Sequence, residues 1–176
     1  MAKKNQNETT DTEANDTTDG LGGLDFNVKD EYKADPLVPN GTYHGAVTKV
    51  SFNASQASIN WSICLNDNGG LLSDGETPLD GSYVFYTNWL PRPGDEDLMT
   101  ASGKNTKRQS KINMLSEFAE ALDIDMSTPQ AIMEGIQDGQ WIGMAVDVTT
   151  QIEEYNGKFS SKVKLGGMKK SSLYEE

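Results

Sequence analysis

Short segments in which apolar and polar residues alternate are the feature that most constrains the fold of this 176-residue chain. The clearest segment covers 141–153, where apolar residues recur at every second position. A similar segment covers 57–65, and β-branched and aromatic residues fill 42–52 and 82–90. A period of two residues is that of a half-buried strand, whereas an amphipathic helix repeats about every 3.6 residues. The chain is therefore predicted to be mainly β.

A fifth strand is predicted after the segment at 141–153. The dipeptide Asn156-Gly157 separates that segment from another alternating one, which begins at Lys158. Asn-Gly between two alternating segments favours a β-hairpin with a two-residue turn. We therefore expect the last two strands to be antiparallel neighbours.

Two helices are predicted between the third and fourth strands. Apolar residues at helical spacing indicate one helix over 109–122. A second helix is expected over 128–137, with Ser127 or Thr128 as its N-cap and Pro129 at its first position. This element order is that of a five-stranded OB-like Greek-key barrel with a helical insertion between strands 3 and 4. Barrels of the SH3 type and irregular sandwiches accommodate the same order, so both alternatives stay open.

The first 35 residues differ in composition from the rest of the chain. They carry nine acidic and four basic side chains, a net charge of 4 minus 9, or -5, and few apolar side chains before Leu21. Such a segment cannot bury enough surface to offset the entropy lost on ordering. We predict an acidic disordered arm at 1–35, an OB-like domain at 36–170 and a short C-terminal tail at 171–176.

Residue counts argue against the common catalytic chemistries. Cys64 is the only cysteine and His44 the only histidine, which excludes an intramolecular disulfide and a zinc site built from several thiolates. A Ser-His-Asp triad would depend on that one imidazole. The neighbouring carboxylates at 95–97 and 153–154 are expected to be solvated charge. We therefore expect a binding protein that is not an enzyme and that uses no cofactor or metal.

The distribution of apolar residues bears on location. No apolar stretch approaches the roughly 20 residues that cross a bilayer, and residues 1–10 contain no hydrophobic signal core. We expect a cytoplasmic protein that does not associate with membranes.

Positive charge is segregated although the formal net charge is -12. Nine of the 15 basic residues lie in two acid-free windows, 100–116 and 155–174. Segregation of this kind can maintain a local phosphate-binding surface in an acidic protein. A solvated loop and a lysine-protected edge strand explain the windows equally well. The candidate phosphate contacts are Lys49 on the first strand, Arg92 after the third strand and, within the two windows, Lys104, Lys107, Arg108, Lys111, Lys158, Lys162 and Lys164.

Aromatic residues complete the requirements for binding single strands, because bases stack on them with about 1 to 3 kcal/mol each. Trp61 and Phe159 share faces with aliphatic residues and are expected in the core. Alternation assigns neither Tyr83 nor Phe85 to a face. The candidate stacking residues are Tyr86, Trp89 and Tyr155.

A series of turn and strand motifs runs through residues 39–168. They are Pro39-Asn40-Gly41-Thr42-Tyr43, the strand of Trp61, segment 86–90, the lysine-rich connector before the helix, Gly139-Gln140-Trp141-Ile142-Gly143, and Glu154-Tyr155-Asn156-Gly157-Lys158 followed by Lys162-Val163-Lys164. In this order they resemble the phage-encoded family of OB-fold single-stranded DNA-binding proteins. The resemblance implies protection of single-stranded DNA in phage replication and recombination. It also implies a hairpin near the DNA that carries Tyr155, Lys158, Lys162 and Lys164.

One feature departs from this resemblance. Replicative single-strand binders usually carry a C-terminal acidic tail with an apolar tip that recruits partner enzymes, whereas here the long acidic segment is N-terminal. The prediction is a sequence-tolerant binder of single-stranded DNA in the host cytoplasm, with phage replication or recombination proteins as candidate partners and homo-oligomerisation left open. The alternative is a non-catalytic phage virion, assembly or host-interaction protein with an acidic β-domain.

Overall fold

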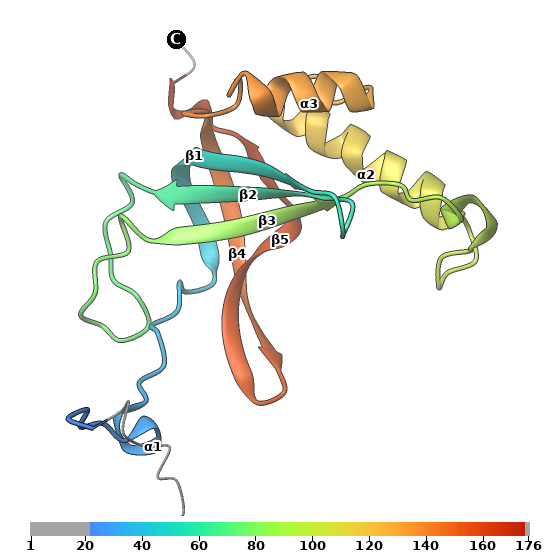
Figure 1. The fold of residues 1–176 in the computed structure, drawn as a ribbon. Coiled ribbons are helices and arrows are strands. Elements are labelled where there is room, and N and C mark those ends of the chain that lie inside the picture. The colour runs from blue at the N-terminus through green and yellow to red at the C-terminus, as the bar shows by residue number, and fades with distance from the viewer. Residues whose placement is uncertain (1–21, 175–176) are drawn as a thin grey trace, which may run out of the picture. The chain divides into compact units, whose positions relative to one another are not determined.

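The computed structural model describes residues 22–174, and the chain divides between Asp35 and Pro36 into two units. In the described part of the larger unit, five antiparallel strands form one open sheet in the order β3-β2-β1-β4-β5 (Figure 1). The strands are β1 (Gly41–Asn53), β2 (Ser58–Leu65), β3 (Tyr83–Trp89), β4 (Ala145–Tyr155) and β5 (Lys158–Lys170). The helices are α1 (Val28–Glu31), α2 (Lys107–Leu122) and α3 (Pro129–Gln137), with 3-10 turns η1 (Asp95–Asp97) and η2 (Ser172–Tyr174). The predicted mainly β class with helices between the third and fourth strands is confirmed.

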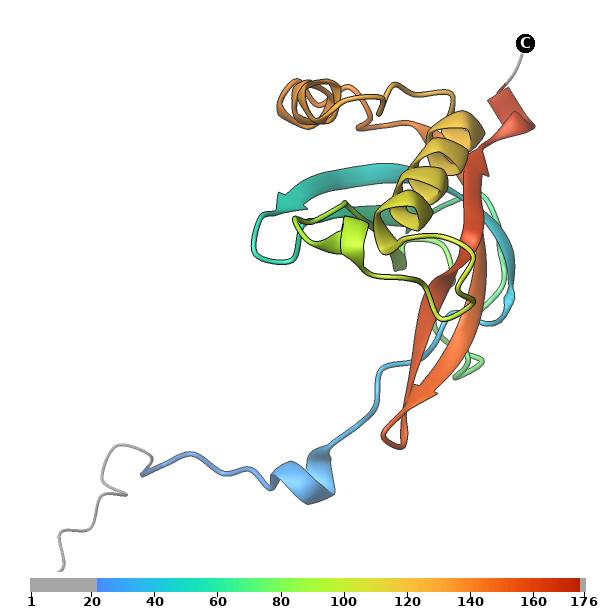
Figure 2. The ribbon, with the colours of Figure 1, turned by 90° about the vertical axis from the view of Figure 1, so that its right-hand side faces the viewer.

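The two edge strands of this sheet come close to each other. β3 contacts β5, and α2 contacts both strands; Figure 2 shows α2 running beside β5. Within residues 22–174 no ladder of hydrogen bonds joins β3 to β5, so the sheet is open.

Trp61 lies at the centre of the core. It is fully buried, and its indole ring lies 5.2 Å from the ring of Phe118 in α2 and 5.3 Å from that of Trp141. Its Nε1 donates a hydrogen bond of 2.6 Å to Oδ1 of Asn88 on β3. The expectation that Trp61 belongs to the core is confirmed, and its contacts join β2 to β3, to α2 and to the segment after α3.

The predicted start of α3 follows from the chemistry of its first residues. Thr128 caps α3, since its hydroxyl accepts a 3.1 Å hydrogen bond from the Ala131 N–H, and Pro129 occupies the first helical position. β4 begins at Ala145 and not at the predicted Trp141, because residues 141–144 form a turn in which Trp141 is buried.

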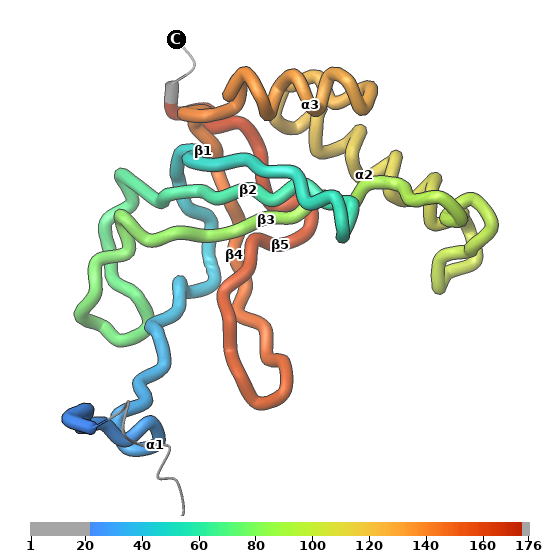
Figure 3. The backbone as a smooth tube through the Cα atoms, viewed as in Figure 1, coloured from blue at the N-terminus to red at the C-terminus, as the bar shows by residue number. Residues whose placement is uncertain are grey.

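The β4–β5 hairpin turns at Asn156 and Gly157, whose φ angles of 52° and 74° are the positive values that a two-residue hairpin turn needs. The hairpin extends beyond the rest of the sheet, because β1 begins at Gly41 opposite Thr150 (Figure 3). Phe159, near the tip, pairs with Glu154 of β4 beyond the level at which β1 begins, and it is 60% exposed. The expectation that Phe159 is a core residue is wrong.

The smaller unit contains the single-turn helix α1. Oδ1 of Asn27 accepts hydrogen bonds from the backbone N–H groups of Lys29 and Asp30, and Oε1 of Glu31 accepts one from the Asn27 N–H. These reciprocal bonds stabilise the start of the turn. Disorder is predicted for the whole arm at 1–35; its residues 1–21 fall outside the described residues, whereas Val28–Glu31 form α1.

None of the helices within residues 22–174 combines the length and the apolar character needed to cross a membrane.

The change Gly135→Ala tests the packing of α3 on Trp141. Alanine in a helix gains about 1 kcal/mol over glycine, but a Cβ at Gly135 would lie 2.4 Å from an atom of the Trp141 six-membered ring. Overpacking of this kind costs about 1 to 3 kcal/mol, so we expect a lower free energy of unfolding in urea. The penalty should shrink in a Trp141→Phe background, because the smaller phenylalanine side chain lacks the outer part of the indole that a Cβ at Gly135 would meet. A Gly135→Ala protein as stable as wild type would contradict this packing.

Candidate nucleic-acid interface

Three exposed aromatic side chains lie on one face of β3. Tyr83, Phe85 and Trp89 are 54%, 61% and 44% exposed, whereas Tyr86 and Asn88 between them are buried. Successive residues of a strand point to opposite faces, so the odd-numbered positions share the outer face of the sheet. We refer to Tyr83, Phe85 and Trp89 as the aromatic row.

Lys49 lies on the same face because β1 contains a bulge. Val47 pairs with Ile63 and Lys49 with Ser62, so Thr48 is an extra residue between the two pairs. Without the bulge, Lys49 would share the inward face of Val47, two residues before it. Ser62 also pairs with Phe85. Lys49, Ser62 and Phe85 thus form one cross-strand line on the outer face.

Small polar groups lie between the lysine and the aromatic row. Asn60 pairs with Ser51 and with Thr87, and Thr87 Oγ1 donates a 3.0 Å hydrogen bond to Asn60 Oδ1. No aspartate or glutamate occurs in β1, β2 or β3, although the chain contains 27 acidic residues. The face therefore offers aromatic rings, hydrogen-bonding groups and one cation without a competing anion on these strands.

Further basic residues follow the end of β3. Arg92 is exposed, and its guanidinium donates to the backbone oxygen of Gln56 in the β1–β2 loop. Lys104, Lys107 and Arg108, in the connector and the first turn of α2, are exposed. These four residues remain available for contacts with phosphate.

Lys111 is occupied by an ion pair. Its Nζ lies 2.7 Å from Oδ2 of Asp95, and Asp95 is only 7% exposed. The Lys111 hydrogen bond, and after it the N–H of Arg92, lower the pKa of the Asp95 carboxyl. The ion pair links η1 to α2. Because the charge of Lys111 is already paired with Asp95, the structure contradicts the assignment of Lys111 as a phosphate contact.

Tyr86 does not belong to the interface. It is 8% exposed, and its ring stacks on that of Phe118 at 5.1 Å and 4°. Burial raises the pKa of its phenol, and a hydrogen bond with the Gly166 backbone lowers it in part. The prediction that Tyr86 stacks on a base is wrong, since its face is already covered. Tyr83 and Phe85, which alternation left unassigned, occupy the exposed positions instead.

The predicted hairpin residues lie on a different part of the sheet. Tyr155 is 78% exposed and pairs with exposed Lys158 at the tip, while Nζ of Lys162 lies 3.0 Å from Oε2 of Glu153. Lys164 is exposed where β5 departs from regular pairing with β4. The structure thus does not gather all twelve predicted residues in one place.

Among the residues that the structure describes, neither His44 nor the carboxylates belong to a cluster suited to a metal ion. No group of three or more His, Cys, Asp or Glu residues suited to a metal ion occurs in the described part of the chain. His44 Nδ1 lies 2.9 Å from the hydroxyl of Ser171 and 3.4 Å from Oδ1 of Asp147. The imidazole therefore connects β1 to the residue that follows β5.

No protein-family model matches the chain, and no curated protein matches it.

The Asp95–Lys111 pair predicts a pH dependence of stability. Because the carboxyl has a lowered pKa in the folded protein, the pair stabilises fully above the ordinary value near 4 and progressively less as the pH falls below it. Asp95→Asn should lower the Tm at pH 6, and the loss should become smaller as the pH is lowered from 4 toward 2.5. The control Asp97→Asn changes an exposed carboxylate of the same turn. An Asp95→Asn effect that is constant across this range would contradict the pair's role.

Proposed function

We propose that the protein binds single-stranded DNA without strong sequence preference through the outer face of β1, β2 and β3. The observation that carries this proposal is the aromatic row on an acid-free face of a chain whose net charge is -12. Binding of single strands combines stacking on aromatic faces with positive groups along the backbone. The aromatic row supplies the first of these, and Lys49, Arg92 and the exposed connector residues supply the second.

The spacing of the aromatic row favours an extended strand. Tyr83 and Phe85 are two residues apart, or about 6.7 Å along a strand, roughly twice the 3.4 Å rise between stacked bases. Neighbouring bases therefore cannot stay stacked on each other while each stacks on a ring. This favours single strands over duplex, in which the bases are stacked and paired.

The sheet order supports an OB-like barrel as the architecture of this binder. Closure of β3 against β5 would convert the order β3-β2-β1-β4-β5 into a five-stranded barrel, and the two strands are in contact. OB-folds bind oligonucleotides on the face of strands 2 and 3 and on the loops that join strands 1–2 and 4–5. All three members of the aromatic row and Ser62 would belong to that face, and Tyr155 and Lys158 would flank the second of those loops.

Protection of DNA during phage replication and recombination is the role that the sequence resemblance implies, and we retain it as part of the proposal. Such a role needs no catalytic group, and partner proteins would meet the complex through surfaces other than the aromatic row.

Tryptophan fluorescence tests the proposal directly. Trp89 is 44% exposed, whereas Trp61 and Trp141 are at most 4% exposed. Oligo-dT at low salt should therefore change the emission of wild type and of Trp141→Phe, but not that of Trp89→Phe. Unchanged emission together with no gel shift would reject DNA binding and favour a protein-contact role for the same face.

Alanine at Phe85 or Trp89 should weaken binding to oligo-dT by about 1 to 3 kcal/mol each, the contribution of one stacked base. Both side chains are largely exposed, so the fold should persist. The matched control is Ile142→Ala, an apolar side chain 50% exposed outside the sheet. Fluorescence anisotropy with labelled DNA measures the affinities. If both variants bind as tightly as the control, β3 is not part of the binding site.

Removing charge from the connector should flatten the salt dependence. Each phosphate contact contributes about 0.7 to the slope of log K against log salt for single strands. The triple change Lys104→Gln, Lys107→Gln and Arg108→Gln should therefore reduce the slope by up to about 2. Lys169→Gln, an exposed lysine that pairs with Asp147 across β4 and β5, serves as control. A triple variant with the wild-type slope would exclude the connector from the DNA path.

A further inference from the structure

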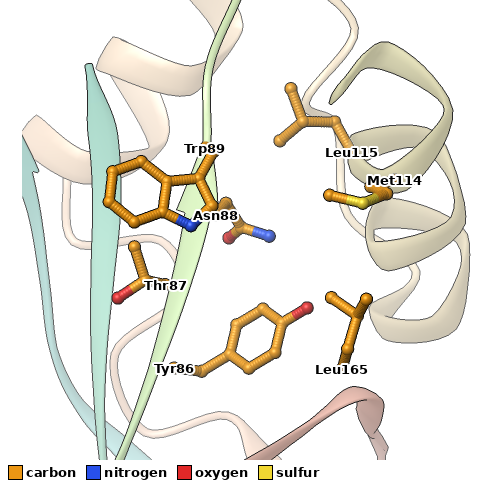
Figure 4. Close-up of a pocket in the computed structure, with 7 residues that line it drawn as sticks. All are labelled: Tyr86, Thr87, Asn88, Trp89, Met114, Leu115 and Leu165. Atoms are coloured by element: carbon orange, nitrogen blue, oxygen red, sulfur yellow. The ribbon is translucent and has the colours of Figure 1, made fainter. Parts of the chain in front are cut away.

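A small pocket opens at the edge of β3, between that strand, α2 and β5 (Figure 4). Met114 and Leu115 of α2 and Leu165 of β5 form its apolar wall. Its volume is about 60 Å³, so an edge of a base could enter but not a whole ring system. Trp89 of the aromatic row also lines it, which places the pocket beside the proposed path of the DNA.

Two buried side chains with polar atoms line this pocket: Asn88, which is 6% exposed, and Tyr86, whose phenol is hydrogen-bonded with the Gly166 backbone. Oδ1 of Asn88 accepts the hydrogen bond of Trp61 Nε1. An indole N–H can only donate, so the oxygen of the Asn88 amide must face Trp61. The NH₂ group of the amide therefore points away from Trp61. Figure 4 shows the Asn88 nitrogen directed toward the side of the pocket formed by Met114 and Leu165. Among residues 22–174, no protein acceptor is hydrogen-bonded to this nitrogen, and the nitrogen is not one of the fully buried polar atoms that lack a partner, so it is open to solvent through the pocket.

The pocket therefore combines one fixed donor with an apolar wall. An occupant that displaced water from this donor without offering an acceptor would leave the donor unpaired, which is costly, so the preferred occupant carries an acceptor next to an apolar group. Among the bases, thymine presents its O4 acceptor beside the C5-methyl group, whereas cytosine presents an N4 amine donor at the corresponding position. Uracil has the acceptor without the methyl group.

We propose that this pocket takes the O4 and methyl edge of one thymine of the bound strand. O4 accepts from Asn88 Nδ2, and the methyl group packs against Met114, Leu115 and Leu165. The inference rests on the proposed function, and it adds to a sequence-tolerant surface one position that prefers thymine. Cytosine at that position would direct its amine at the Asn88 donor.

The test measures the affinity of the full chain for dT, dU and dC oligonucleotides of equal length at one salt concentration. We expect dT to bind about fourfold more tightly than dU, the effect of burying one methyl group. Because dC lacks the acceptor as well as the methyl group, dU should bind about fivefold more tightly than dC, the effect of one hydrogen bond, and dT about twentyfold more tightly than dC. Equal affinities would overturn the thymine pocket and leave the proposed function intact. Absence of binding to all three would overturn the proposed function as well.

Two variants test whether the base preference arises from the pocket or from differences among the oligonucleotides themselves. Asn88→Asp keeps an acceptor for Trp61 but replaces the donor with an acceptor, so the preference for dT over dC should reverse. Leu165 is 68% exposed, so Leu165→Ala should fold even if Asn88→Asp does not, and it should bring the dT to dU ratio close to one. Leu71→Ala, at a leucine 47% exposed in the β2–β3 connection, should keep the wild-type ratio. A Leu165→Ala protein with the wild-type ratio would overturn the proposal.

Discussion

The hydrogen bond between the Trp61 indole and the Asn88 amide is the interaction on which the rest of the structure depends. At 2.6 Å it joins β2 to β3 inside the core, where a polar side chain without a partner would be costly. The same indole contacts the rings of Phe118 and Trp141, so one residue aligns the sheet with both parts of the helical insertion. Because this bond fixes the face of β3 that is buried, it also fixes the face on which the aromatic row is exposed.

The sequence predicted the strands, the two longer helices and the hairpin, since each depends on local periodicity or turn chemistry. It could not assign the faces of β3, because residues 83–86 are all apolar and alternation gives no contrast there. Tyr86 was expected at the surface because it shares a face with the polar Asn88. That amide instead pairs with Trp61 in the core, and Phe118, more than thirty residues further along the chain, covers the Tyr86 ring. The surroundings of Lys111 and Phe159 likewise depend on tertiary structure. Lys111 forms an ion pair with the buried Asp95 in η1, and Phe159 lies beyond the level at which β1 begins.

The bulge in β1 shows how a single extra residue changes a surface. Thr48 shifts the pairing so that Lys49 faces outward, and its hydroxyl donates a 3.1 Å hydrogen bond to the Ser62 carbonyl. A strict alternation would direct the lysine toward the core beside Val47, where burial of an unpaired charge is unfavourable. Only the bulged register places Val47 in the core and Lys49 at the surface. The bulge is therefore a consequence of the sequence.

A second irregularity lies in β5, the strand that comes closest to the free edge of β3. In β5, Val163 pairs with Thr150 and Met168 with Val148, so residues 164–167 leave the regular ladder with β4. Gly166 has a φ of 71°, and a Cβ at Gly167 would lie 2.8 Å from the Lys164 carbonyl oxygen, so only glycine fits both positions without strain. Within residues 22–174 no ladder joins this segment to β3, and side chains of α2 and Leu165 line the space between the two strands. The space that a closed barrel would fill with backbone hydrogen bonds is therefore the one that the Asn88 amide faces (Figure 4).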